Sequence, residues 1–165
     1  AGHWAGCTSC GTTALLSVAK TMLRRKKTPS GKQRCRLYYN EGMAAHTHSW
    51  PHIEKCTRAM HAYDHLVQAG LIDQCEVLPG RPATDAELLT AHSRQHLDEV
   101  AAITQAVQAD PTNRKLREPD GPGGVYYSPE AEASARLACG CVVQAALDVL
   151  EAGRAAPTER PLAFA

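Results

Sequence analysis

The chain has 165 residues, with 18 Lys and Arg against 17 Asp and Glu, and 44% of its residues are hydrophobic. This size suits one globular domain that buries on the order of 70% of its unfolded surface. No apolar run approaches the roughly 18 residues of a membrane span and no signal-peptide pattern is present, so we expect neither a membrane partner nor secretion. Seven cysteines without a secretion signal favour reduced thiols and a nuclear or cytoplasmic location.

Residues 1–33 are predicted to form a basic, cysteine-containing N-terminal extension. A short helix is expected over 12–25, followed by a turn-rich linker at 29–31. The first 36 residues carry eight basic residues and no acidic one, whereas the remainder has ten basic and seventeen acidic residues. The basic stretch 20–36 could contact nucleic acid or act as a nuclear signal, but a solvated basic tail is equally compatible with it.

Cys7 and Cys10 are spaced like half of a zinc finger. A structural zinc site needs four ligands, and no second Cys-x-x-Cys pair follows. The two cysteines are therefore weak metal candidates, with a plain pair of thiols as the alternative.

Residues 34–165 are predicted to form the main domain, in which strands and helices alternate. Strands are expected at 36–39 and 75–78, and helices over 55–69, from 84 to about 92, and from 93 to about 109. The helix boundaries rest on Gly70 as a C-terminal stop, on a capping box of Thr84 with Glu87, and on Ser93 as an N-cap. This alternation implies an α/β fold with a parallel sheet.

The last third of the domain is predicted to be a loop followed by a long helix. The polar, Pro- and Gly-rich stretch 110–124 indicates a long surface loop. Ser128 and Pro129 are expected to open a helix that runs to about residue 152 and ends at Gly153.

Four segments within residues 34–165 follow in order the pattern of one enzyme family. They are Arg36-Leu37-Tyr38-Tyr39-Asn40-Glu41-Gly42-Met43 with His46; His52-Ile53-Glu54-Lys55-Cys56-Thr57-Arg58; Gly70-Leu71-Ile72-Asp73-Gln74-Cys75 with Arg81-Pro82-Ala83-Thr84-Asp85-Ala86-Glu87-Leu88-Leu89 and His92-Ser93; and Val125-Tyr126-Tyr127-Ser128-Pro129 with Ala135-Arg136-Leu137-Ala138-Cys139-Gly140. Together they resemble the first third of the class II histone deacetylase domain. Ile53 and Cys56 depart from the family, which usually has proline at both positions.

The resemblance implies an incomplete three-layer, parallel-sheet deacetylase-like fold in which helices dominate. In that family a strand follows the long helix, and residues 161–165 resemble its beginning. The zinc ligands, the catalytic histidines and the transition-state tyrosine come after that strand. The complete family domain uses zinc to polarise the amide carbonyl and activate water. We therefore expect no catalytic residue, no metal ligand and no bound zinc in this chain.

The resemblance also assigns four residues to the substrate rim or tunnel: His52, Glu54, Arg58 and Gly124. Arg58 matches an arginine near the tunnel base, and the alternative is an ion pair with Glu54 four residues earlier. Gly124 stands where the family often has a serine that accepts a substrate hydrogen bond, so this gate has no side chain here.

Several histidines lie close together in the sequence and suggest a metal cluster: His46, His48, His52, His61 and His65. The last two are four residues apart on a predicted helix, a spacing that can chelate a metal. The acidic partner of the helical zinc-protease motif is missing, which favours surface or supporting histidines.

Two main functional hypotheses follow, beside a weaker one of a small zinc-binding adaptor built on Cys7 and Cys10. The chain is the N-terminal part of a zinc-dependent lysine deacetylase that hydrolyses acetyl-lysine, and is inactive alone; or it is a non-catalytic, deacetylase-derived structural or interaction subunit of a larger assembly. Both predict a partner, either another chain or the missing C-terminal part, which covers the open sheet edge. An acetylated protein is the expected substrate once the domain is complete.

Overall fold

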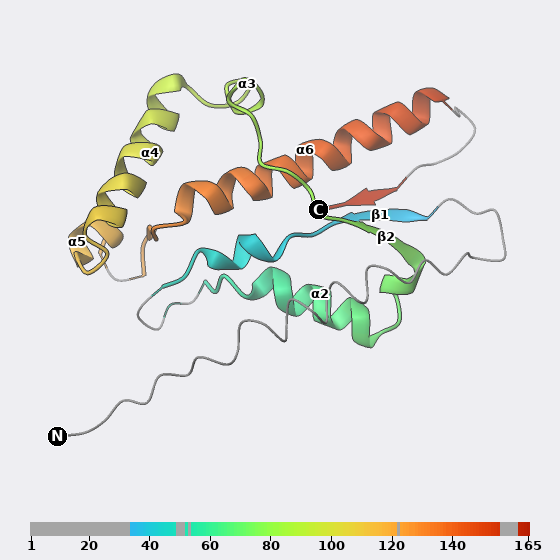
Figure 1. Ribbon diagram of the computed structural model, residues 1–165, viewed down its shortest axis with the longest axis horizontal. Helices are drawn as coiled ribbons and strands as arrows, with labels where there is room; N and C mark the ends of the chain where they lie inside the picture. Colours follow the sequence, from blue (N-terminus) through green and yellow to red (C-terminus); the bar gives the residue numbers. More distant parts are fainter. Residues whose placement is uncertain (1–33, 49–51, 53, 122, 156–161) are drawn as a thin grey trace. The chain divides into compact units, whose positions relative to one another are not determined.

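The computed structural model describes residues 34–48, 52, 54–121, 123–155 and 162–165 (Figure 1). The predicted extension over 1–33, including its helix, Cys7 and Cys10, lies outside the described residues.

The sheet has three parallel strands, β1 (Cys35–Tyr38), β2 (Cys75–Leu78) and β3 (Ala163–Phe164). Their order is β2-β1-β3, so β1 is central, and Leu37 lies opposite Val77 on one side and Phe164 on the other. The predicted α/β fold with a parallel sheet is confirmed. The first strand begins one residue earlier than predicted, and the strand expected within 161–165 is present.

Helices make up most of the described chain. They are η1 (Glu41–Ala45), α2 (Arg58–Gln68), η2 (Ile72–Gln74), α3 (Asp85–Leu88), α4 (Arg94–Ala109), α5 (Arg114–Arg117) and α6 (Ala131–Ala155). Gly70 adopts φ +68° after α2, which is the left-handed conformation that stops a helix. The helix predicted from Thr84 to about residue 92 is a single turn, because after α3 the amides of Thr90 and Ala91 bond three residues back.

Helix α6 continues through Gly153, so the predicted stop there is wrong. Gly153 does not adopt a positive φ, and a glycine inside a helix costs only about 1 kcal/mol relative to alanine.

An 18-residue window of α6 has a mean hydropathy of 1.4, so α6 is long and apolar enough to cross a membrane by length and composition alone. The expectation that no stretch reaches this length is therefore wrong, although core helices of soluble proteins pass the same test.

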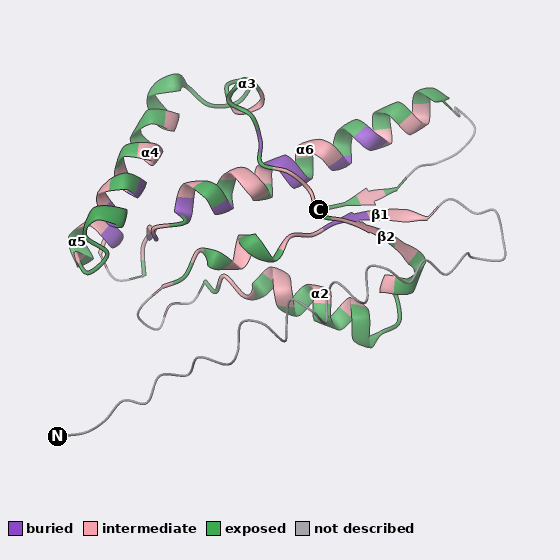
Figure 2. Cartoon of the chain, in the orientation of Figure 1, coloured by how far each residue is buried: buried purple, intermediate pink, exposed green. Residues whose placement is uncertain are grey.

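Helix α6 packs on the sheet through a small core. Tyr38, Cys141 and Ala145 are buried together, and Figure 2 shows the buried positions recurring along α6. Asp148 of α6 accepts hydrogen bonds from the Tyr38 hydroxyl and from Arg36 Nη1, the latter at 2.6 Å. Burial acts to raise the pKa of Asp148, but the hydrogen bonds that its carboxylate accepts outweigh burial, so its pKa is lowered. The pKa of Tyr38 is raised to about 12, first by burial and then by the hydrogen bond to Asp148.

The backbone after β2 crosses α6 at Gly140. A Cβ atom on Gly140 would lie 1.8 Å from the carbonyl oxygen of Arg81 and 2.6 Å from the amide nitrogen of Ala83. That amide donates to the carbonyl of Arg136 at 2.8 Å, one helical turn earlier. Only glycine permits this approach, so Gly140 sets the distance between α6 and the segment that follows β2.

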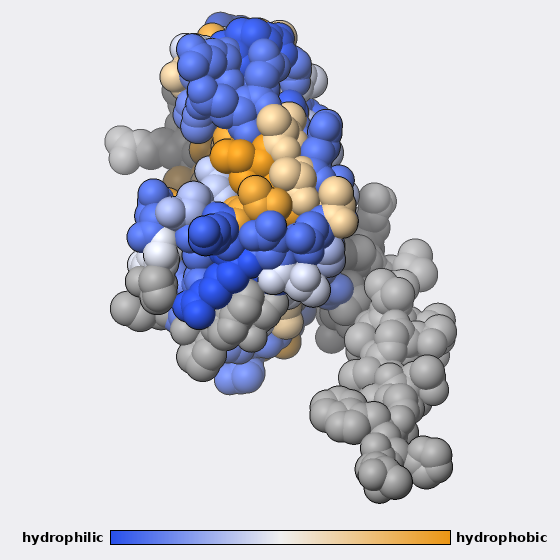
Figure 3. Space-filling view, turned by 90° about the vertical axis from the view of Figure 1, so that its left-hand side faces the viewer, coloured by the Kyte–Doolittle hydropathy of each residue, from blue (hydrophilic) through white to orange (hydrophobic). Residues whose placement is uncertain are grey.

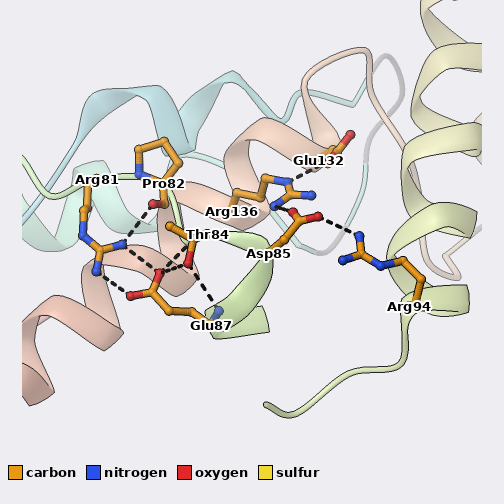
Figure 4. A network of polar contacts seen from close by, with 8 residues as sticks. All are labelled: Arg81, Pro82, Thr84, Asp85, Glu87, Arg94, Glu132 and Arg136. Carbon is orange, nitrogen blue, oxygen red and sulfur yellow. Dashed lines mark hydrogen bonds and ion pairs between the residues drawn. The ribbon is translucent and has the colours of Figure 1, made fainter. Parts of the chain in front are cut away.

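The predicted capping box at the start of α3 is confirmed and extends into a network of ion pairs (Figure 4). The Thr84 amide donates to Glu87 Oε2 at 2.8 Å, and Arg81 binds the same carboxylate through both terminal nitrogens. The Arg81 hydrogen bond, followed by that of the Thr84 amide, lowers the pKa of Glu87 to about 2. Asp85 accepts from Arg94 of α4 at 2.6 Å, which links α3 to α4.

Candidate functional site

The predicted rim residues follow the carboxyl end of β1. The chain leaves the sheet after Tyr38 and turns at Asn40, whose side chain accepts from the Gly42 amide at 2.9 Å. It then runs through η1 into the segment that carries His46, His48 and His52. In α/β proteins ligands bind outside the carboxyl ends of the strands, so this is the expected place for a site.

The buried ring of Tyr126 brings three histidines together. It stacks on His46 with ring centroids 4.4 Å apart. It makes edge-to-face contacts with His48 and His52, with ring centroids 4.5 Å and 5.0 Å away. The Tyr126 hydroxyl donates to the carbonyl of His46 at 3.2 Å. Ring pairs of this kind contribute about 0.5–1.5 kcal/mol beyond their burial. These four residues are called the histidine cluster below.

His52 and Gly124, two of the predicted rim residues, are in contact. His52 Nδ1 accepts from the Glu54 amide at 3.1 Å, so the ring proton lies on Nε2, which donates to the Gly124 carbonyl at 3.2 Å. A Cβ atom on Gly124 would lie 2.9 Å from Cβ of Asp120 and 3.3 Å from the carbonyl of Gly121. The loop therefore has no room for a gate side chain, and position 124 can offer only its backbone.

His48 joins the cluster to a buried carboxylate. Its Nε2 lies 2.9 Å from Glu118 Oε1, and the side chains are 5% and 4% exposed. Arg114 Nε donates to the other carboxylate oxygen at 2.7 Å. The Arg114 hydrogen bond lowers the pKa of Glu118, burial opposes this, and His48 lowers the pKa further.

Arg117 holds together the two segments that form the cluster. It is 5% exposed, donates through Nη2 to the Thr47 carbonyl at 3.0 Å, and donates through Nε to the Tyr127 carbonyl at 3.3 Å. It belongs to α5, so the prediction of a loop without helix over 110–124 is wrong in this part. Asn113, whose side chain accepts from the Leu116 amide at 3.4 Å, is the N-cap signal that could have predicted α5.

The surroundings of His46 favour its neutral form. Its Nδ1 lies 3.1 Å from the hydroxyl of Ser128, which is fully buried and accepts from the Glu130 amide at 3.2 Å. The Ser128 hydroxyl proton is therefore free to point at His46. Burial lowers the pKa of His46; nearby Glu130 raises it, and Arg117 lowers it again.

The side chains of Glu54 and Arg58 lie on the surface near the start of α2, although the Glu54 backbone amide bonds to His52 of the cluster. With Lys55, Thr57 and His61 they line an open pocket of about 410 Å³. Glu54 precedes the first residue of α2, and within the described part of the chain no ion pair joins it to Arg58. The alternative of a helical ion pair is therefore not realised, and the structure places Arg58 at an exposed position.

The described residues do not fit a zinc ion. No group of three or more His, Cys, Asp or Glu side chains among them is arranged to hold a metal. The ring nitrogens of the cluster are directed at other partners: His46 at Ser128, His48 at Glu118, and His52 at the backbone. His61 and His65 gain no third ligand in this part of the chain, and Cys7 and Cys10 lie outside it.

Comparison with known proteins assigns the family. A family model described as the histone deacetylase domain matches residues 52–161. Histone deacetylase HDA1 of Saccharomyces cerevisiae is 28% identical over 113 residues, which are 61% of this chain and 15% of that protein. HDA1 of Candida albicans is 27% identical over 113 residues, 61% of this chain and 13% of that protein.

A solved structure agrees at the level of the fold. The crystal structure of the HDA15 HD domain superposes with a TM-score of 0.55 and 23% identity, and the match covers 71% of this chain and 33% of that one. The chain thus spans about a third of the matched structure and a much smaller share of the fungal relatives. It belongs to the histone deacetylase family and carries part of a class II-type deacetylase domain.

Proposed function

We propose that this chain is the N-terminal part of a zinc-dependent lysine deacetylase that hydrolyses acetyl-lysine to lysine and acetate. The observation that carries the proposal is the family match over 52–161, which includes His52, Glu54, Arg58 and Gly124. The position of the histidine cluster beyond the carboxyl end of β1 supports it, because α/β folds bind ligands there. The two fungal relatives are named histone deacetylases.

The role proposed for these residues is to shape the site. Because the described residues do not fit zinc, no hydrolytic step is assigned to them. His52 holds the Gly124 carbonyl, and Arg117 holds the Thr47 and Tyr127 carbonyls. These bonds fix the loop after β1 against the segment before α6. A preorganised wall of this kind lets a substrate bind without the cost of ordering the loop.

The proposal is tested by comparing this chain with the protein made when its coding sequence is read past Ala165. We expect the longer protein to hydrolyse an acetyl-lysine peptide in a zinc-dependent way, and this chain alone to release no acetate with or without zinc. In the longer protein, His52→Ala should lower kcat/KM, whereas His65→Ala, on the exposed side of α2, should leave it unchanged. Chelator-sensitive hydrolysis by the isolated chain would contradict the proposal.

A second candidate function is that of a non-catalytic structural or interaction subunit. Hydrophobic side chains of α6 and of residues 162–164 favour it, because they are exposed in the described part of the chain: Phe164 (71%), Leu162 (67%), Val142 (59%) and Leu150 (57%). On the side that carries α4 and α5, hydrophobic side chains also reach the surface in one patch (Figure 3). The strand order leaves one edge of β2 and one of β3 unpaired among the described strands. Parallel sheets are normally covered, so the remaining part of the domain or another chain is the proposed partner.

Size-exclusion chromatography with light scattering tests this need for a partner. We expect the isolated chain to oligomerise or aggregate, and Phe164→Glu to raise the monomer fraction. Val125→Glu is the matched control, since Val125 is 60% exposed but belongs to neither α6 nor a strand of the sheet. A cooperative monomer of the unaltered chain would remove the argument for a covering partner.

A further inference from the structure

Two thiols lie side by side at the amino ends of β1 and β2. Cys35 and Cys75 are register partners in the parallel pair, each is the first residue of its strand, and each is partly exposed. Residues directly opposite on neighbouring strands point to the same face, with strands about 4.8 Å apart. This spacing lies within the range of roughly 4.4–6.8 Å between Cα atoms that a disulfide spans.

Two backbone carbonyls and the Arg34 side chain lie close to the pair. The Cys35 thiol donates to the carbonyl of Arg36 at 3.7 Å, and the Cys75 thiol donates to the carbonyl of Leu71 at 3.6 Å. Burial, followed by the neighbouring Cys35, raises the pKa of Cys75. Arg34 opposes this rise, and its guanidinium donates to the carbonyl of Asp73 just before β2. The thiolate is the form that attacks a disulfide, so the raised pKa slows attack by Cys75, and the Arg34 cation limits that effect. Cys141, by contrast, is 1% exposed and belongs to the core.

We propose that Cys35 and Cys75 form a reversible disulfide that clamps β1 to β2. With glutathione disulfide as the oxidant, one cysteine thiolate attacks a glutathione sulfur and displaces one glutathione thiolate, which leaves a mixed disulfide on the protein. The second cysteine thiolate then attacks the protein sulfur of that mixed disulfide and displaces the second glutathione. The protein loses two electrons and two protons, and one glutathione disulfide becomes two glutathiones.

The clamp would enclose the segment that builds the candidate site. The chain between Cys35 and Cys75 contains the loop with His46, His48 and His52 and the whole of α2. Closing this segment covalently restricts the unfolded chain more than the folded one. Oxidation would therefore stabilise the loop on β1 without touching the histidine cluster itself. The inference depends on the strand register alone and stands whether or not the chain is part of a deacetylase.

The test uses the full chain with Cys7→Ser and Cys10→Ser, because that Cys-x-x-Cys pair could also oxidise. The protein is incubated natively with glutathione disulfide and examined by intact mass and by peptide mapping without reductant. We expect loss of two hydrogen atoms, a cross-linked peptide pair holding Cys35 and Cys75, and full reversal by dithiothreitol. The urea midpoint of the oxidised protein should exceed that of the reduced protein.

Cys75→Ser should abolish the cross-link and leave a mixed disulfide on Cys35, whereas Cys139→Ser, on α6, should leave the cross-link intact. Because the cross-link is mapped first in protein with both thiols present, the result does not depend on how well the Cys75 variant folds. Glutathione adducts that persist on both cysteines, or a cross-link from either one to Cys56, would overturn the proposal.

Discussion

Substituting Gly140 by alanine should destabilise the fold more than its single added methyl group suggests. The new Cβ would lie 1.8 Å from the Arg81 carbonyl oxygen and 2.7 Å from the Pro82 carbonyl carbon. Contacts below 3.0 Å are essentially never seen for Cβ atoms. Since the obstacles are backbone atoms, no side-chain rotation relieves them, and the segment after β2 must move away from α6 by roughly 1 Å or more.

The expected cost is the balance of three effects. Overpacking against backbone costs about 3 kcal/mol. Separation of the two segments weakens the hydrogen bond from the Ala83 amide to the Arg136 carbonyl, worth about 1 kcal/mol. The higher helix propensity of alanine stabilises the folded state by about 1 kcal/mol. We therefore expect Gly140→Ala to lower the free energy of unfolding by about 3 kcal/mol, a large part of the roughly 5–15 kcal/mol typical of a domain.

Urea unfolding followed by far-UV circular dichroism, at one protein concentration, measures this change. Gly153→Ala is the matched control, because Gly153 lies in the same helix and a Cβ there meets nothing within 4 Å. It should raise the free energy of unfolding by about 0.5–1 kcal/mol. If Gly140→Ala proved as stable as Gly153→Ala, the close approach of α6 to the Arg81–Ala83 segment would be wrong.

Three further predictions concern the capping box, the core network and the cluster. Thr84→Ala should lower the free energy of unfolding by about 1 kcal/mol, and Thr84→Ser should not; equal losses would show that the cap is not formed. Asp148→Asn should cost about 1.5–3 kcal/mol and move the absorbance titration of Tyr38 from about 12 toward its ordinary 10.0, whereas an unmoved titration would contradict the contact. Because the pKa of His46 is lowered in the folded chain, the unfolded chain binds more protons than the folded chain just below pH 6.5. The contribution of neutral His46 to stability is therefore complete above pH 6.5 and is lost as the pH falls. His46→Phe should flatten that part of the urea-unfolding pH profile, and an unchanged slope would assign it to other groups.

Local signals in the sequence were sufficient to predict where the capped helices start. Ser93 predicted the start of α4 because its hydroxyl accepts from the His96 amide three residues later, at 3.1 Å. Thr84 and Glu87 predicted the start of α3 for the same reason. Such capping contacts join residues that are neighbours in the chain, so their geometry follows from the backbone of one helical turn. The order of the four segments likewise predicted the family and its parallel sheet.

Helix ends were predicted less well where glycine was the only signal. Gly70 stops α2, whereas Gly153 lies inside α6. Glycine is found at both positions because a glycine inside a helix costs little free energy. At Gly153 the packing of α6 on β1 and β3 offsets that cost.

The histidine cluster, by contrast, was decided by the tertiary structure. His46 and Tyr126 are 80 residues apart in the chain, and Arg117 reaches Thr47 across 70 residues. No periodicity or spacing encodes such contacts, because they depend on how α5 and the loop after β1 pack against each other. The sequence by itself determined the strands, the capped helices and the family, whose signals are local or follow the order of the chain. Only the tertiary structure decided which of the histidines meet, since burial of Arg117 and Glu118 beneath them is a property of long-range packing.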